Sequence, residues 1–120
     1  MKKYIYIVFL VIVSISNAQK KNSKNEKTTF RVSGNCEMCK MRIEKAALSV
    51  SGVKLAKWSI PENQLTLIYN SNRVKLLEIH NSISLSGHDT SFKDAPTDTY
   101  NDLPICCLYV REEKSKAPFK

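Results

Sequence analysis

Several features are missing from this sequence of 120 residues, and each absence excludes a class of protein. The longest apolar run, residues 4–15, is shorter than the roughly 20 residues that span a bilayer comfortably. No Ser-His-Asp grouping or nucleotide-binding loop is recognisable, so we expect a protein that is not an enzyme. The formal charge is +8, but no nucleic-acid motif occurs and the basic residues are not interleaved with aromatic ones. We therefore expect a solvated basic surface and no nucleic-acid partner.

The first residues have the pattern of an export signal. Two lysines precede the apolar run of residues 4–15, and Ser16-Asn-Ala18 follows as a small-x-small cleavage pattern. This predicts a signal peptide over residues 1–18 that is cleaved after Ala18. No cysteine stands at the cleavage site to carry a lipid anchor, so we expect a soluble periplasmic or secreted protein without stable membrane insertion. A retained membrane anchor is the alternative.

The remaining chain divides into three segments. Residues 19–27 are rich in lysine and predict a flexible basic leader. Residues 28–93 alternate between the periodicities of strands and helices, and residues 94–120 form a C-terminal extension. Within the middle segment we predict strands at residues 28–33, 53–60, 64–69 and 88–93, of which the second and third form a β-hairpin. We predict helices at residues 37–49 and 73–85, which Gly52 and Gly87 terminate. This order predicts an α+β fold, a ferredoxin-like β-α-β-β-α-β sandwich, followed by a short extension that contains cysteine.

Two cysteines stand where the first predicted helix begins. Cys36-Glu-Met-Cys39 follows a predicted strand and a turn at Gly34-Asn35. The first turn of a helix offers unpaired N–H groups and the positive end of the helix dipole, and both stabilise thiolates. Thiolates bind soft metals and attack disulfides. The position of Cys36 and Cys39 thus predicts metal binding or redox chemistry.

These motifs resemble the heavy-metal-associated domain of copper chaperones, periplasmic mercury-binding proteins and metal-pumping ATPases. The resemblance covers about residues 28–93 and is carried by the turn, Cys-x-x-Cys, an Ala-rich helix, Gly52-Val53 and Gly87-His-Asp89. It implies that Cys36 and Cys39 bind one soft ion, with Cu(I) favoured over Hg(II), Zn(II) and Cd(II). Family members commonly read Gly-Met-Thr-Cys where this chain has Gly34-Asn-Cys36, a turn one residue shorter.

The resemblance implies a metal carrier, chaperone or buffer that passes its ion to a metal-transporting ATPase or another acceptor protein. Cu(I) accepts two thiolates without a further ligand, which permits transfer, whereas Zn(II) normally requires four ligands. The alternative for Cys36 and Cys39 is a periplasmic thiol-disulfide redox pair, since an exported protein meets an oxidising environment. The complete β-α-β-β-α-β order favours the metal function.

The C-terminal extension supplies two adjacent thiols, Cys106 and Cys107, which ordinary domains of this family lack. Adjacent cysteines rarely bond to each other because the ring is strained, so we expect them to face Cys36 and Cys39 or an ion. A short helix near residues 97–103 would let the chain return to the Cys36 loop. An auxiliary metal role and a structural role as buried thiols both remain open.

A few other side chains have two interpretations. His88 is a further candidate auxiliary ligand, because the family places metal-tuning residues after the corresponding glycine, but a solvated turn histidine is the alternative. We expect His80 on a helix flank, and we expect Met38 and Met41 to serve as packing residues rather than ligands. Trp58 and Tyr69 are predicted core or sheet-face residues.

Overall fold

The computed structural model of the protein describes residue 2 and residues 24–111. The predicted signal peptide, apart from residue 2, lies outside these residues, as do most of the predicted leader and the last nine residues of the extension, 112–120. Within the described part of the chain, no helix combines the length and the apolar character needed to cross a membrane.

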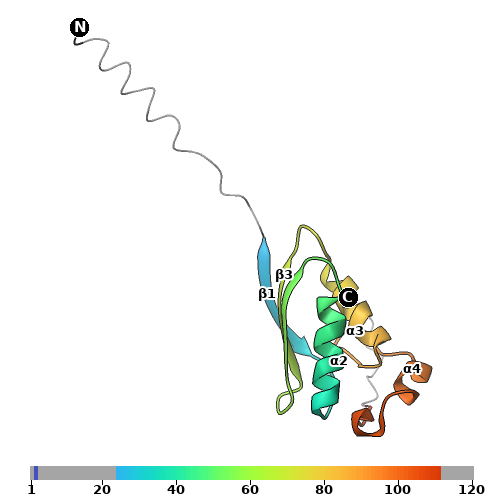
Figure 1. Cartoon of the computed structure of the whole chain (residues 1–120). Coiled ribbons are helices and arrows are strands. Elements are labelled where there is room, and N and C mark those ends of the chain that lie inside the picture. The colour runs from blue at the N-terminus through green and yellow to red at the C-terminus, as the bar shows by residue number, and fades with distance from the viewer. Residues whose placement is uncertain (1, 3–23, 112–120) are drawn as a thin grey trace.

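A three-stranded antiparallel sheet forms one layer of the domain (Figure 1). Its strands lie in the order β1 (Asn25–Arg31), β3 (Gln64–Asn70) and β2 (Val53–Ser59). The first strand thus starts earlier than the predicted residue 28. The predicted hairpin joins β2 to β3, and Asn63 in its turn has a φ of 52°, which asparagine tolerates better than most residues.

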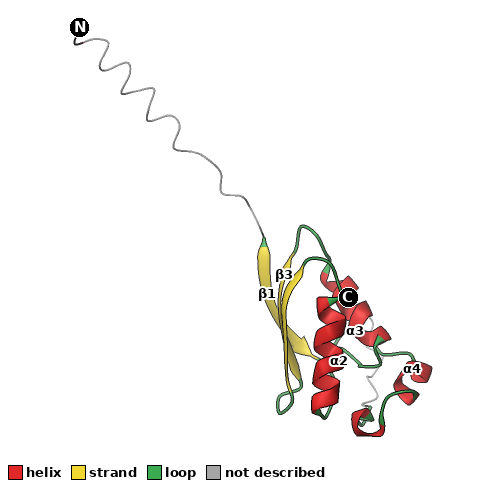
Figure 2. Ribbon diagram, in the orientation of Figure 1, coloured by secondary structure: helices red, strands yellow, loops and turns green. Residues whose placement is uncertain are grey.

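Two helices cover one face of this sheet (Figure 2). Helix α2 (Glu37–Leu48) buries Cys39, Ile43 and Ala47, which recur every four residues and so share one side of the helix. Helix α3 (Leu76–Leu85) buries Ile79 and Ile83 in the same way. These side chains pack on an apolar core from the sheet that includes Trp58, Leu65 and Leu67, all fully buried.

Glycines follow both helices, as predicted. Gly52 and Gly87 each have a φ of 104°, a left-handed conformation that strains residues with a Cβ atom. Helix α3 begins later than the predicted residue 73, because the N–H groups of Arg73 and Val74 both donate to the carbonyl of Asn70 in a preceding turn. The α+β ferredoxin-like architecture is confirmed, with the cysteine-containing extension attached to it.

The predicted fourth strand, residues 88–93, is reduced to one bridge between Val32 and Thr90. Side chains redirect the chain at this point. The Thr90 hydroxyl accepts hydrogen bonds from the N–H groups of Phe92 and Lys93, at 3.3 and 3.0 Å, and closes a tight turn. The Asp89 carboxylate accepts one from the Ala95 N–H at 2.7 Å. These local bonds replace the ladder that a longer strand would have formed.

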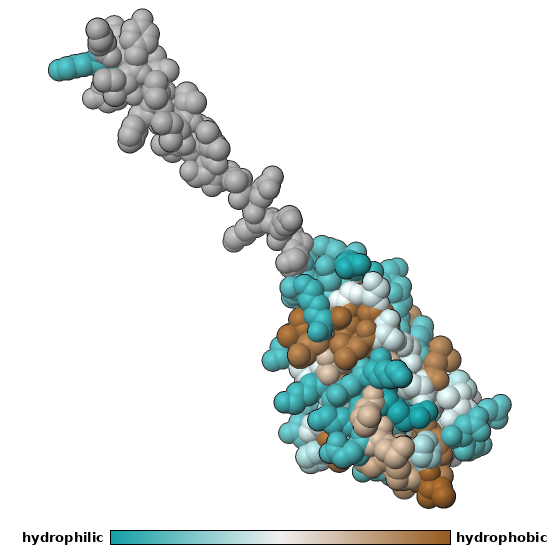
Figure 3. Space-filling view, in the orientation of Figure 1, coloured by the Kyte–Doolittle hydropathy of each residue, from teal (hydrophilic) through white to brown (hydrophobic). Residues whose placement is uncertain are grey.

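The extension then folds back as two short helical segments. Helix α4 (Thr97–Asn101) confirms the short helix expected near residues 97–103, and the 3-10 turn η1 (Ile105–Cys107) follows it and packs near α2 (Figure 1). Leu103, between them, is buried in the main core. On the face seen in Figure 3, hydrophilic residues surround smaller apolar areas. Ile105 and Val110 in the extension are 89% and 91% exposed.

Candidate metal centre

The loop before α2 is held tightly against the core. A Cβ atom on Gly34 would lie 2.9 Å from Cη2 of Trp58 and 3.0 Å from Cβ of Cys39. Only glycine therefore fits at this close approach. The Trp58 indole N–H donates to the Val32 carbonyl at 3.0 Å and fixes the ring under the loop. Core packing thus positions the cysteine motif.

The two cysteines of the motif occupy the first turn of α2. Cys36 is the N-cap residue, half-buried and in extended conformation, and Cys39 is fully buried. Their Sγ atoms lie 3.2 Å apart. The Cys39 thiol donates to the side-chain oxygen of Asn35 at 3.4 Å, so the short turn contributes a polar contact of its own.

The environments of these thiols differ. Burial raises the pKa of Cys36, but the backbone N–H of Cys39 and the neighbouring thiols outweigh that and lower the pKa to about 7. Burial raises the pKa of Cys39, and burial together with the thiols of Cys39 and Cys36 raises the pKa of Cys107. Cys36 is therefore the thiol best suited to act first as a ligand or nucleophile.

The extension brings its two cysteines to the same place. The Sγ atom of Cys107, which is fully buried, lies 3.5 Å from that of Cys36. The ligand atoms of Cys36, Cys106 and Cys107 all lie within 4.8 Å of one another. Cys106 is exposed, and its Sγ atom lies 3.4 Å from the Sδ atom of Met38. All four cysteines carry free thiols.

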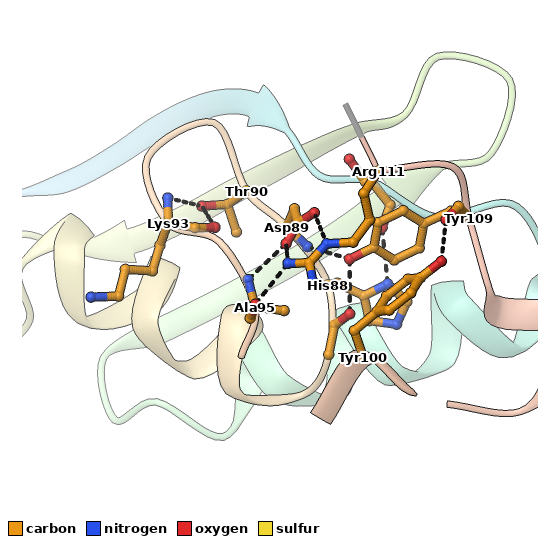
Figure 4. A network of polar contacts seen from close by, with 10 residues as sticks. His88, Asp89, Thr90, Lys93, Ala95, Tyr100, Tyr109 and Arg111 are labelled. Carbon is orange, nitrogen blue, oxygen red and sulfur yellow. Dashed lines mark hydrogen bonds and ion pairs between the residues drawn. The ribbon is translucent and has the colours of Figure 1, made fainter. Parts of the chain in front are cut away.

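A polar network fastens the extension beyond Cys107 (Figure 4). Arg111 binds Asp89 through two hydrogen bonds, Nε to Oδ2 at 2.9 Å and Nη2 to Oδ1 at 2.7 Å. The same Nη2 donates to the Ala95 carbonyl at 2.7 Å. The Asp89 side chain is only 7% exposed, so this bidentate pair is a well-shielded contact.

Tyr109 makes the second part of this polar network, which we call the anchor of the extension. Its buried hydroxyl accepts from the Asp89 N–H at 2.8 Å and donates to the Gly87 carbonyl at 2.9 Å. The Tyr100 hydroxyl donates to the Tyr109 carbonyl, and the two rings meet edge to face. Together these contacts fix the chain two residues beyond Cys107 (Figure 4).

The structure buries both histidines. His80 lies in helix α3, on its buried side: the residue is 1% exposed, its ring contacts those of Phe30 and Phe92, and its Nδ1 atom forms a hydrogen bond with the Thr90 hydroxyl at 2.7 Å. The solvated interpretation of His88 is wrong. Its Nδ1 atom donates to the Ser33 carbonyl at 2.9 Å, its ring stacks on Tyr109, and burial lowers its pKa.

Neither His88 nor Cys39 is part of the group of ligand atoms within 4.8 Å of one another, which contains Cys36, Cys106 and Cys107; Cys39 is joined to this group through its contact with Cys36 at 3.2 Å. Among the described residues the Nε2 atom of His88 has no hydrogen-bond partner. Met41 is 70% exposed and Met38 is 48% exposed, so both methionines are more open to solvent than the expected packing role implies. Trp58 and Tyr69 are buried, as predicted.

The sulfur atoms have the spacing of atoms that share one ion. At the zinc–thiolate distance of about 2.3 Å, two sulfurs on a common ion are at most about 4.6 Å apart. The separations of 3.2 Å from Cys36 to Cys39 and 3.5 Å from Cys36 to Cys107 fall below this limit. The donor set is purely sulfur, which suits soft ions.

No protein-family model and no curated protein matches this chain in sequence. Solved structures do match it. A putative copper-ion-binding protein from Bacillus anthracis is 27% identical, with a TM-score of 0.55, over 58% of this chain and 100% of that one. The N-terminal domain of a potential copper-translocating P-type ATPase from Bacillus subtilis, solved in the Cu(I)-loaded state, is 25% identical, with a TM-score of 0.53, over 55% and 84%.

The chain resembles heavy-metal-associated domains, as its motifs predicted. Oxidised MerP from Ralstonia metallidurans shares this fold at 19% identity, with a TM-score of 0.54, over 56% of this chain and 94% of that one.

Sequence reasoning missed the residues that hold the extension in place. Asp89, Tyr109 and Arg111 have no periodic pattern, and 22 residues separate Asp89 from Arg111. One signal was available: an aspartate interrupts a stretch that otherwise resembles a strand, and a tyrosine and an arginine follow closely after Cys106-Cys107. Such residues in a short tail indicate specific docking rather than a solvated end.

Proposed function

We propose that this protein is a carrier, chaperone or buffer for a soft metal ion, with Cu(I) as the cargo and Cys36 and Cys39 as its ligands. One observation carries the proposal: sulfur atoms 3.2 Å apart stand at the start of α2 in a fold whose neighbours include copper-binding proteins. The chemistry agrees, because thiolates prefer soft ions and a helix start favours thiolates. Hg(II), Zn(II) and Cd(II) are the alternative cargoes.

A carrier must also release its ion. Cys36 is half-buried, so the thiol of an acceptor protein can approach the ion from solvent and replace one ligand at a time. A metal-transporting ATPase is a suitable acceptor, and the similarity to the Bacillus subtilis ATPase domain supports this choice. The neighbours at 25% and 27% identity are a domain of a potential copper-translocating ATPase and a putative copper-ion-binding protein, which supports a carrier rather than an enzyme.

We place this carrier outside the cytoplasm, in the periplasm or secreted. The support is the apolar run of residues 4–15 with its cleavage pattern at Ala18. Intact mass spectrometry of the protein from its native host should find a chain that begins at Gln19. A chain of full length in the membrane fraction would mean instead that the segment anchors the domain.

Anaerobic titration with Cu(I) against a chromophoric chelator tests the metal function. The wild-type protein should bind one Cu(I) per chain tightly, and Cys36→Ser or Cys39→Ser should abolish tight binding. Retention of wild-type affinity in either variant would contradict the proposal. Circular dichroism of each variant, compared with wild type, verifies that the fold is intact.

A thiol-disulfide redox function is the second candidate, since the Cys36 and Cys39 sulfurs are close enough to form a disulfide after a small movement and the pKa of Cys36 is lowered to about 7. It predicts a reversible dithiol couple that reduces substrate disulfides. An insulin-reduction assay on the metal-free protein separates the two functions: robust turnover favours the redox function, and tight Cu(I) binding without turnover favours the carrier.

A further inference from the structure

The two adjacent cysteines of the extension lie in different surroundings. Cys107 is fully buried and contacts Cys36 at 3.5 Å, whereas Cys106 is exposed and contacts Met38 at 3.4 Å. Their own Sγ atoms are 3.9 Å apart. Successive residues of a 3-10 turn point about 120° apart, since the turn has three residues per revolution, so η1 directs the two thiols to different neighbours.

We propose that Cys107 is a third sulfur ligand to the ion held by Cys36 and Cys39, and that Cys106 and Met38 form an outer pair of sulfurs through which the ion enters and leaves. The proposal rests on the soft-metal function given above. It deepens that function by adding an inner ligand, Cys107, and an outer pair of soft ligands, Cys106 and Met38.

The position of Cys107 supports its inner role. It lies between two buried attachments: Leu103 packs in the core four residues before it, and Tyr109 bonds Gly87 and Asp89 two residues after it. A thiol held on both sides keeps its distance to Cys36 without ordering a free tail when the ion binds. A side chain that served only as packing would not need a polar anchor of this extent.

The outer pair has the opposite character. Cys106 is exposed, and Met38, in the first turn of α2, is 48% exposed. A thiolate and a thioether are both soft ligands that suit Cu(I). The Cys106 sulfur also lies within 4.8 Å of those of Cys36 and Cys107. An ion bound at the surface pair can therefore reach the inner sulfurs by exchanging one ligand at a time, with no sulfur oxidised or reduced.

X-ray absorption of the purified protein, loaded anaerobically with one equivalent of Cu(I), tests the inner role. Wild type and Cys106→Ser should have three sulfur ligands, and Cys107→Ser should have two. Cys106→Ser is the matched control, because it removes a thiol one residue away. We expect Cys107→Ser to retain Cu(I) against a chelator at least about tenfold less well, since loss of a supporting contact alone costs about 10–100-fold in metal affinity.

Two sulfurs in loaded wild type would overturn the inner role and leave the carrier function standing. This measurement does not depend on the folding of any variant. Identical spectra for wild type and Cys107→Ser, with a lower melting temperature for the variant, would assign Cys107 a structural role. Failure of wild type to bind Cu(I) would overturn both the carrier function and this proposal.

Stopped-flow transfer of Cu(I) to and from a thiol chelator tests the outer pair. Cys106→Ser and Met38→Leu should each slow transfer several-fold while the sulfur number at equilibrium stays at three. Met41→Leu is the control, because Met41 is an exposed methionine on the same helix. Unchanged rates in both variants, or equal slowing in the control, would overturn the outer role.

Discussion

The domain and its extension are held together by different forces. The sheet and helices α2 and α3 depend on buried apolar side chains such as Trp58, Ile43 and Leu67. The extension buries fewer apolar side chains and is fastened by Tyr109 and by the pair of Arg111 and Asp89. The hydrophobic effect has no preferred direction, whereas hydrogen bonds require defined distances and angles. The extension therefore has the more exactly defined attachment, and Cys107 lies two residues before the first of the residues that make it, Tyr109.

The largest effect should come from breaking the common core. Trp58→Ala removes a fully buried indole, which also packs against the loop at Gly34. We therefore expect a loss of about 3–5 kcal/mol in the free energy of unfolding. Both regions should lose structure together. Urea unfolding followed by circular dichroism measures the loss. Trp58→Phe is the control: it keeps an aromatic ring and should cost less, and a large residual stability of Trp58→Ala would contradict the packing described.

A smaller loss of stability, confined to the extension, should follow from breaking its anchor. Tyr109→Phe keeps the ring but leaves the Gly87 carbonyl and the Asp89 N–H without their partner, which should cost about 1–3 kcal/mol. Hydrogen exchange should rise in residues 97–111 while β3 and α2 stay protected. Equal acceleration everywhere would mean that the extension and the domain open as one unit. Tyr69→Phe is the matched control, because its hydroxyl bonds Glu26 within the sheet and does not contact the extension.

The smallest effect concerns pH. Burial lowers the pKa of His88 from its ordinary value of 6.5, so the unfolded chain binds a proton that the folded chain does not. The free energy of unfolding should therefore fall as the pH drops below 6.5 and level off below the folded pKa. His88→Asn keeps a donor for the Ser33 carbonyl and should flatten this dependence. If wild type and variant have parallel pH profiles, the histidine is not buried as described.

The domain was more predictable from the sequence than the extension, for physical reasons. Periodicity predicted α2, α3 and the hairpin because Ile43, Ala47, Ile79 and Ile83 repeat at helical spacing. The prediction of a fourth strand was wrong because the Thr90 hydroxyl closes a tight turn. The β-propensity of single residues is weak, so these local hydrogen bonds outweigh it.

Burial of the histidines could not be predicted locally. His80 is covered by Phe30 and Phe92, and His88 by Tyr109, all of which are contacts between different elements. The approach of Cys107 to Cys36 joins residues 71 apart. The chain length allowed that approach, and the contacts of Leu103, Tyr109 and Arg111 with the domain select it.

The central claim is that the domain and the extension build one sulfur site, and trapping a disulfide tests it most directly. In Cys39→Ser, Cys36 loses the thiol at 3.2 Å and keeps that of Cys107 at 3.5 Å. Mild anaerobic oxidation with diamide, followed by peptide mapping, should find Cys36 bonded to Cys107 within one chain and Cys106 free. Dimers linked through Cys36, with Cys107 unpaired, would contradict the account.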